Sequence, residues 1–127
     1  MGFFEKLFKS EVKKIISKNN AKRSSLSEKL EYVAANSFPE YELRKEIPAS
    51  EMGAGHEAKN YSYGLYKNGE PKAFMMIISD RNQYRKKEIR LAKEAAEWNG
   101  VPYMNFFSHL PNEETYIDER IRKNLFA

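Results

Sequence analysis

The side chains in this sequence that could do chemistry are carboxylates at the ends of expected strands and in expected helices. Carboxylates that converge on rigid elements can hold a divalent cation, and a nearby lysine can assist the water that attacks a phosphodiester. The candidate centre of this kind consists of Glu31, Asp80, Glu88 and Lys86, and further acids at strand ends are Glu57 and Glu70.

Each member of this candidate centre also has an interpretation that involves no chemistry. Glu31 fits a solvent-facing position of a helix, and Asp80 fits a helix N-cap, whose side chain accepts a hydrogen bond from a backbone N–H. Lys86 and Glu88 fit a charged helix surface. We favour these structural interpretations, so the sequence argues against an enzyme.

Composition removes several other kinds of site. The chain contains no cysteine, which excludes disulfides, thiolate metal sites and thiol nucleophiles. Its two histidines, His56 and His109, are too few for a histidine-rich zinc site. No cofactor is therefore expected, and Mg²⁺ would be needed only if the carboxylates form a nuclease centre.

Basic residues concentrate in one segment, although the net charge of the whole chain is only +4. Residues 81–97 carry six cations against three acids, and such a cluster can contact phosphates. Tyrosines on a strand can stack on bases, although cross-strand packing is the interpretation we favour for them, and a solvated surface is the alternative for the cations. The candidate nucleic-acid-binding residues are Arg81, Arg85, Lys86, Lys87, Arg90, Tyr61 and Tyr63, with the two tyrosines expected on one face of their strand.

The elements that would position these residues follow from apolar spacing and turn residues. A chain of 127 residues fits one compact domain. Ser25, with Glu28 three residues later, predicts the start of a helix that ends at Pro39. Alternation of apolar and polar residues then predicts a half-exposed strand at 41–47.

A hairpin is the strongest local prediction. Asn68-Gly69 lies between expected strands at 61–67 and 70–79, and both turn residues tolerate a positive φ. The second of these strands is apolar on both faces over 73–78. It is therefore expected in the middle of a sheet that helices cover on both sides.

A crossover helix and a further strand follow the hairpin. Asp80 and Gln83 predict a capping box for the helix, which ends at Asn99-Gly100. An apolar strand at 101–107 is then expected to pair in parallel with the strand before the helix. The expected buried faces are Tyr84, Leu91, Ala92, Ala95 and Trp98 in this helix, and Tyr116, Ile117, Ile121 and Leu125 in a last helix at 112–126.

Residues 1–18 are predicted to form an amphipathic helix that stands apart, joined by a linker at 19–25 to the domain at 26–127. Its apolar side is bulky and its other side is rich in lysine, which suits an anionic membrane surface. Packing onto the domain and self-association are the alternatives. No apolar run suits a membrane span or a signal peptide, so a cytoplasmic location is expected, peripheral to the membrane if the helix binds lipid.

The αβββαβ order, with a hairpin leading into a central apolar strand, resembles the restriction-endonuclease-like PD-(D/E)XK superfamily over residues 25–107. This resemblance implies metal-dependent phosphodiester hydrolysis by an acid on the second strand, an acid on the third strand, and a lysine two residues later. Here Tyr61 to Tyr66 contains no acid, the third-strand positions are apolar and no Pro-Asp dipeptide occurs. The catalytic residues therefore cannot be carried over. Residues 41–125 also resemble a domain of short bacterial proteins, and this second resemblance brings no known activity with it.

Together these patterns predict a mixed α/β fold: an αβββαβ core with a central mixed sheet flanked by helices, plus the N-terminal and C-terminal helices. The first functional hypothesis is a nuclease-like fold that has lost its metal centre and binds a partner, with nucleic acid as the candidate. The second is a metal-dependent endonuclease with relocated carboxylates. The third is a membrane- or protein-interaction module that acts through the N-terminal helix.

Overall fold

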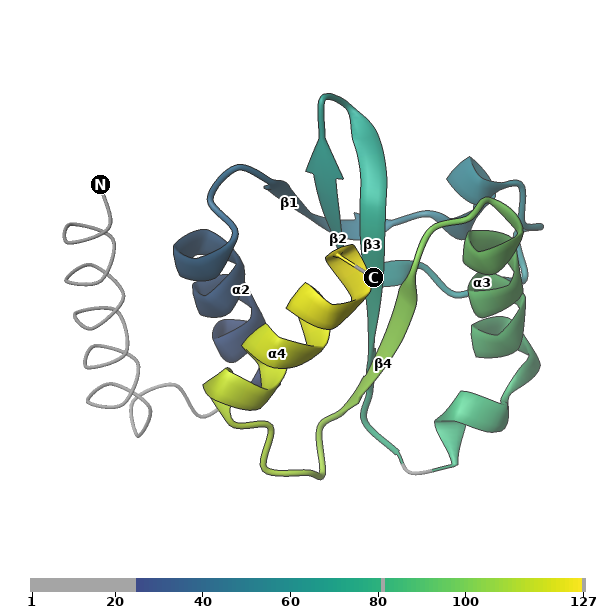
Figure 1. Ribbon diagram of the computed structural model, residues 1–127. Coiled ribbons are helices and arrows are strands. Elements are labelled where there is room, and N and C mark those ends of the chain that lie inside the picture. The colour runs from purple at the N-terminus through teal and green to yellow at the C-terminus, as the bar shows by residue number, and fades with distance from the viewer. Residues whose placement is uncertain (1–24, 81, 127) are drawn as a thin grey trace, which may run out of the picture.

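The computed structural model describes residues 25–80 and 82–126 (Figure 1), so the predictions for the N-terminal helix, for the linker before residue 25 and for Arg81 lie outside the described residues. The fold is α+β. Its elements in chain order are α2 (Leu26–Ser37), β1 (Glu42–Ile47), the short 3-10 helix η1 (Ala49–Met52), β2 (Tyr61–Lys67), β3 (Glu70–Ile78), the 3-10 turn η2 (Gln83–Arg85), α3 (Lys87–Trp98), β4 (Tyr103–Phe107) and α4 (Glu114–Leu125).

The four strands form one mixed sheet in the order β1-β2-β3-β4. β1 is antiparallel to β2, β2 is antiparallel to β3, and β3 is parallel to β4. The predicted hairpin is confirmed, with φ of 55° at Asn68 and 77° at Gly69. The predicted central position of β3 and its parallel pairing with β4 are also confirmed.

Helices cover both faces of the sheet, as Figure 1 shows, with α2 and α4 on one face and α3 on the other. Two buried clusters separate the sheet from these helices. The α2/α4 side is built around Leu30, Phe38, Leu65, Met75 and Phe106. The α3 side is built around Tyr61, Phe74, Met76, Ile78 and Ile89.

The prediction that Tyr61 and Tyr63 share a face is wrong. Tyr61 packs in the cluster under α3, whereas Tyr63 packs in the cluster under α2 and α4. Strict alternation fails because the ladder of β1 and β2 is distorted between the Lys45–Tyr63 and Ile47–Tyr61 pairs, where Glu46 has a φ of 49°. A positive φ is rare for a residue other than glycine, and here it accompanies the change of face in both strands.

The predicted start of α3 is also wrong, and Ala92 is the only residue of its predicted buried face that is fully buried within the described helix. Asp80 and Gln83 form a turn around η2, and α3 begins only at Lys87. Its buried residues are Ile89, Ala92 and Ala96, so the helix is rotated relative to the predicted face and Trp98 is 89% exposed. In α4, Ile117 and Ile121 are buried as predicted, but Tyr116 is 45% exposed.

The three α-helices of the described chain all begin at the end of the sheet where β3 and β4 end (Figure 1). Their N-terminal N–H groups therefore lie toward one edge of the domain, where they favour negative charge. No helix within residues 25–80 or 82–126 has the length and hydropathy that crossing a membrane would require.

Candidate nucleic-acid interface

The start of α3 carries the exposed cations that the sequence analysis singled out. Lys86 occupies the N-cap with extended backbone (φ −66°, ψ 144°), and no side chain caps the helix there. Lys87 follows as the first helical residue, and Arg90 lies one turn later. Arg85 precedes them at the end of η2, and all four residues are exposed.

These cations stand at the wrong end of α3 for helix stability. A helix dipole favours acids at the N-terminus and cations at the C-terminus. The first turn of α3 has one acid, Glu88, and the last turn has no basic residue but contains Glu97. Stability therefore does not explain why lysines occupy the first two positions, and the lysines add to the positive potential of the helix end.

The partners of Lys87 and Arg90 leave these two cations available to a phosphate. Lys87 Nζ lies 3.2 Å from Glu57 Oε2, and Arg90 Nε lies 3.8 Å from Glu94 Oε1. All four of these side chains are more than half exposed, and exposed ion pairs contribute only about 0–1 kcal/mol. Lys86 makes no ion pair within the part of the chain that the structure describes. A phosphate can therefore compete for these groups at little cost.

Tyr61 is not placed to stack on a base. Its side chain is fully buried, its ring stacks on Phe74 with centroids 4.0 Å apart, and its hydroxyl donates to the carbonyl of Ala92 over 2.7 Å. Burial raises the pKa of this hydroxyl to about 12. The packing interpretation therefore describes Tyr61, which holds α3 against the sheet.

Tyr63 holds α2 in the same way on the other face. Its hydroxyl donates to Glu31 Oε2 over 2.5 Å, and Lys45 Nζ lies 3.1 Å from Glu31 Oε1. The bond from Tyr63 and the Lys45 ammonium lower the pKa of Glu31, while burial and then the Glu31 bond raise the pKa of Tyr63 to about 12. Glu31 therefore links a helix to two strands, so it is more than a solvent-facing residue.

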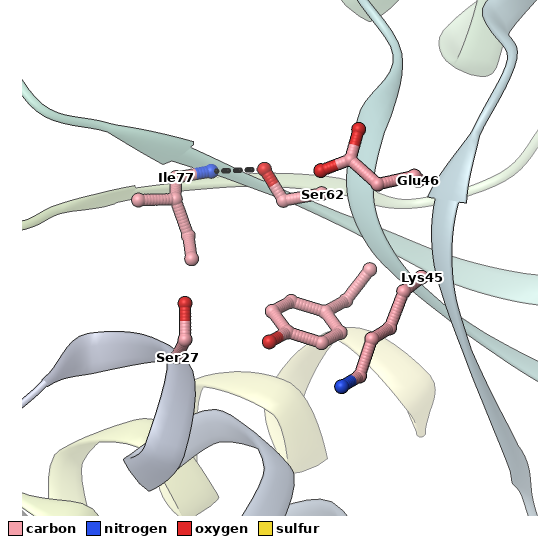
Figure 2. Close-up of a pocket in the computed structure, with 6 residues that line it drawn as sticks. Ser27, Lys45, Glu46, Ser62 and Ile77 are labelled. Carbon is pink, nitrogen blue, oxygen red and sulfur yellow. Dashed lines mark hydrogen bonds between the residues drawn. The ribbon is translucent and has the colours of Figure 1, made fainter.

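A small polar depression of about 270 Å³ lies beside this link, between the start of α2 and the distorted stretch of β1 and β2 (Figure 2). It is lined by Ser27, Lys45, Glu46, Ser62, Tyr63 and Ile77. Ser62 Oγ accepts a hydrogen bond from the backbone N–H of Ile77 over 2.9 Å, so a side chain replaces a ladder bond between β2 and β3. This serine is used structurally.

The four residues of the candidate metal centre are not brought together. Glu31 lies on α2 and Glu88 on α3, on opposite faces of the sheet (Figure 1). Asp80 Oδ1 accepts from the N–H of Asn82 in the turn before η2, and Lys86 occupies the N-cap position of α3. In residues 25–80 and 82–126, no three side chains of the His, Asp or Glu type gather closely enough to hold a metal ion.

The exposure of Trp98 was not predicted, because its spacing from Leu91 and Ala95 placed it on the expected buried face of α3. The spacing of small residues indicates the correct face. Ala92 and Ala96 are four residues apart and fit a close helix–sheet contact, which places Trp98 on the solvent side of α3. Comparison of the chain with models of protein families, with curated proteins and with solved structures gives no match.

Proposed function

We propose that this domain is a restriction-endonuclease-like αβββαβ core without a catalytic centre, and that it binds nucleic acid through η2 and the first half of α3. The observation that carries the proposal is the set of exposed cations at the uncapped start of α3. Phosphate groups are the ligands that such a cluster, together with a helix N-terminus, recognises best.

The order of elements supports the fold part of the proposal. A helix, three antiparallel strands, a helix and a strand parallel to the third are the arrangement that the resemblance implies. The lack of acids in β2 and in the apolar stretch of β3 supports the loss of catalysis. β2 has no carboxylate, and the only one in β3 is Glu70 at the hairpin, where it pairs with Lys72.

Binding to labelled single- and double-stranded DNA and RNA, measured by fluorescence anisotropy over a range of salt, tests the proposal. We expect micromolar binding that weakens as salt rises, because phosphate contacts release counterions. The variant Lys86→Glu/Lys87→Glu should bind at least about tenfold more weakly and lower the salt slope by about 2. Negative side chains near a helix N-terminus stabilise the helix, so the two glutamates of this variant should not unfold α3.

The matched control is Lys72→Glu/Lys123→Glu, which changes the net charge equally but at the hairpin end of β3 and in the last turn of α4. It should keep most of the affinity. Absence of salt-dependent binding by the wild type, or an equal loss in the control, would overturn the proposal. Incubation with nucleic acid and Mg²⁺ or Mn²⁺ should give no cleavage, and cleavage that Glu31→Gln abolishes would refute the loss of catalysis.

A further inference from the structure

Trp98 stands in solvent at the end of α3. Its side chain is 89% exposed, the highest value among the exposed large hydrophobic residues of the described chain, and it is the single tryptophan of the sequence. An indole is a large flat apolar ring, and leaving it in water forgoes the stabilisation that burial gives. Packing of the domain therefore does not explain this residue.

Trp98 lies on the same face of α3 as the cations. With 3.6 residues per turn, the eleven steps from Lys87 to Trp98 complete three turns to within about 20°, and Arg90 lies about 60° from Lys87. Ile89, Ala92 and Ala96 are buried on the opposite side. The outer face of α3 therefore presents cations at one end and an indole about 16 Å away at the other.

We infer that this outer face binds single-stranded nucleic acid, with Trp98 stacked on an unpaired base and Lys87 and Arg90 on phosphates of the same strand. The inference rests on the proposed function and adds the strandedness of the ligand and the residue that reads it. A ring on a helix surface can stack only on a base whose face is open, and inside a duplex the neighbouring bases in the stack cover both faces of each base.

Charge complementarity favours a strand over an apolar protein partner. The cations on this face, Lys87 and Arg90, precede Trp98 along the helix and match a backbone that carries one phosphate per nucleotide. Glu94 lies between them and Trp98, and its charge is offset by Arg90 at 3.8 Å. Replacing Glu94 by a neutral residue would remove a negative charge and free Arg90 from this ion pair, so it should tighten binding of a nucleic-acid strand. Binding of an apolar partner should not tighten in this way.

The fluorescence of the single tryptophan reports on the stacking directly. The full chain is titrated with an unlabelled single strand of about 12 nucleotides and with the corresponding duplex. We expect strong quenching of emission by the single strand and little by the duplex. In anisotropy, Trp98→Ala should bind the single strand at least about fivefold more weakly, Trp98→Phe should retain most of the affinity, and Glu94→Gln should bind more tightly.

The control is Tyr116→Ala, which removes an exposed aromatic ring from α4 and should not change binding. If the strand binds with unchanged emission and Trp98→Ala binds like the wild type, this inference is overturned while the proposed function stands. If neither strand nor duplex binds, both are overturned. A blue shift of emission that grows with protein concentration alone would place a second copy on Trp98 and would also overturn the inference.

Discussion

The first turns of α2 and α3 lie at the same end of the sheet but are built in opposite ways. At α2, Ser25 Oγ accepts from the N–H of Glu28 over 3.1 Å and donates to the Glu28 carboxylate over 2.9 Å. At α3, the N-cap is Lys86 and no side chain caps the helix. The start of α2 thus has the cap and the acid that stabilise it. The start of α3 has no side-chain cap and carries lysines at the N-cap and at the first helical position.

The rest of each helix follows the same division. α2 buries Leu26, Leu30, Val33 and Ala34 and is tied to the strands through Glu31. α3 buries one large side chain, Ile89, with two alanines, and leaves its tryptophan in solvent. The residues of α2 thus stabilise the fold, whereas the surface of α3 carries features that stability does not explain. Function is best sought on α3.

The largest difference is expected from shortening a buried side chain of α2. Leu30 is 1% exposed, so Leu30→Ala should lower the free energy of unfolding by about 2–5 kcal/mol, because it removes apolar contacts and leaves a cavity. Leu91→Ala, on the half-buried flank of α3, is the control and should cost less than about 1 kcal/mol. Urea denaturation measures both. Equal losses would contradict the division between the helices.

Removing the cap of α2 should have the next largest effect. Ser25→Ala leaves the N–H of Glu28 without its side-chain acceptor, and we expect a loss of about 1 kcal/mol in unfolding free energy. Ser25→Asp serves as the control, because its carboxylate can accept the same bond and should restore the stability. Thermal unfolding followed by circular dichroism measures the change. An unchanged unfolding midpoint in Ser25→Ala would show that the cap does not stabilise the protein.

Giving α3 the cap that it lacks should act in the opposite direction. Lys86 has the extended backbone of an N-cap, so Lys86→Ser should raise the unfolding free energy by about 0.5–1 kcal/mol while weakening nucleic-acid binding. Lys93→Ser removes the same charge from inside the helix without adding a cap, and its stability should not rise. A stability gain with undiminished binding would show that Lys86 does not contact the ligand.

The smallest effect concerns the link from α2 to the strands and depends on pH. The pKa of Glu31 is lowered in the folded protein, so its carboxylate stabilises the fold above the unfolded pKa of about 4.3, and this stabilisation is lost as pH falls through the lower folded pKa. Glu31→Gln should therefore cost up to about 1 kcal/mol at neutral pH and nothing at strongly acid pH. Tyr63→Phe removes the main cause of the shift and should flatten this dependence. Urea midpoints across this pH range give the comparison, and a pH-independent cost would argue against the carboxylate as the cause.

Much of the fold could be predicted because local signals were strong. Asn68-Gly69 specified the hairpin, the apolar run of β3 specified a central strand, and Ser25 with Glu28 specified the start of α2. Each of these depends on a few neighbouring residues, whose backbone conformation or burial follows from their own chemistry.

The parts that could not be predicted depend on tertiary contacts. The turn at η2 competes with helix at Asp80, because Asp80 and Gln83 hydrogen-bond within the turn, and only packing sets the rotation of α3. The faces of Tyr61 and Tyr63 depend on the left-handed backbone of Glu46, which no local pattern indicated. The candidate metal centre does not form because Glu31 and Glu88 lie in helices on opposite faces of the sheet, and Asp80 lies in the turn before η2.

The change of face between Tyr61 and Tyr63 has a consequence for cooperativity. Two residues of β2 are hydrogen-bonded to different helices, since the hydroxyl of Tyr61 donates to α3 and the hydroxyl of Tyr63 donates to α2. Loss of either helix would remove a partner from the strand that anchors the other. The two layers should therefore unfold as a single unit, and buried amides of α2 and α3 should exchange their hydrogens with the same opening free energy.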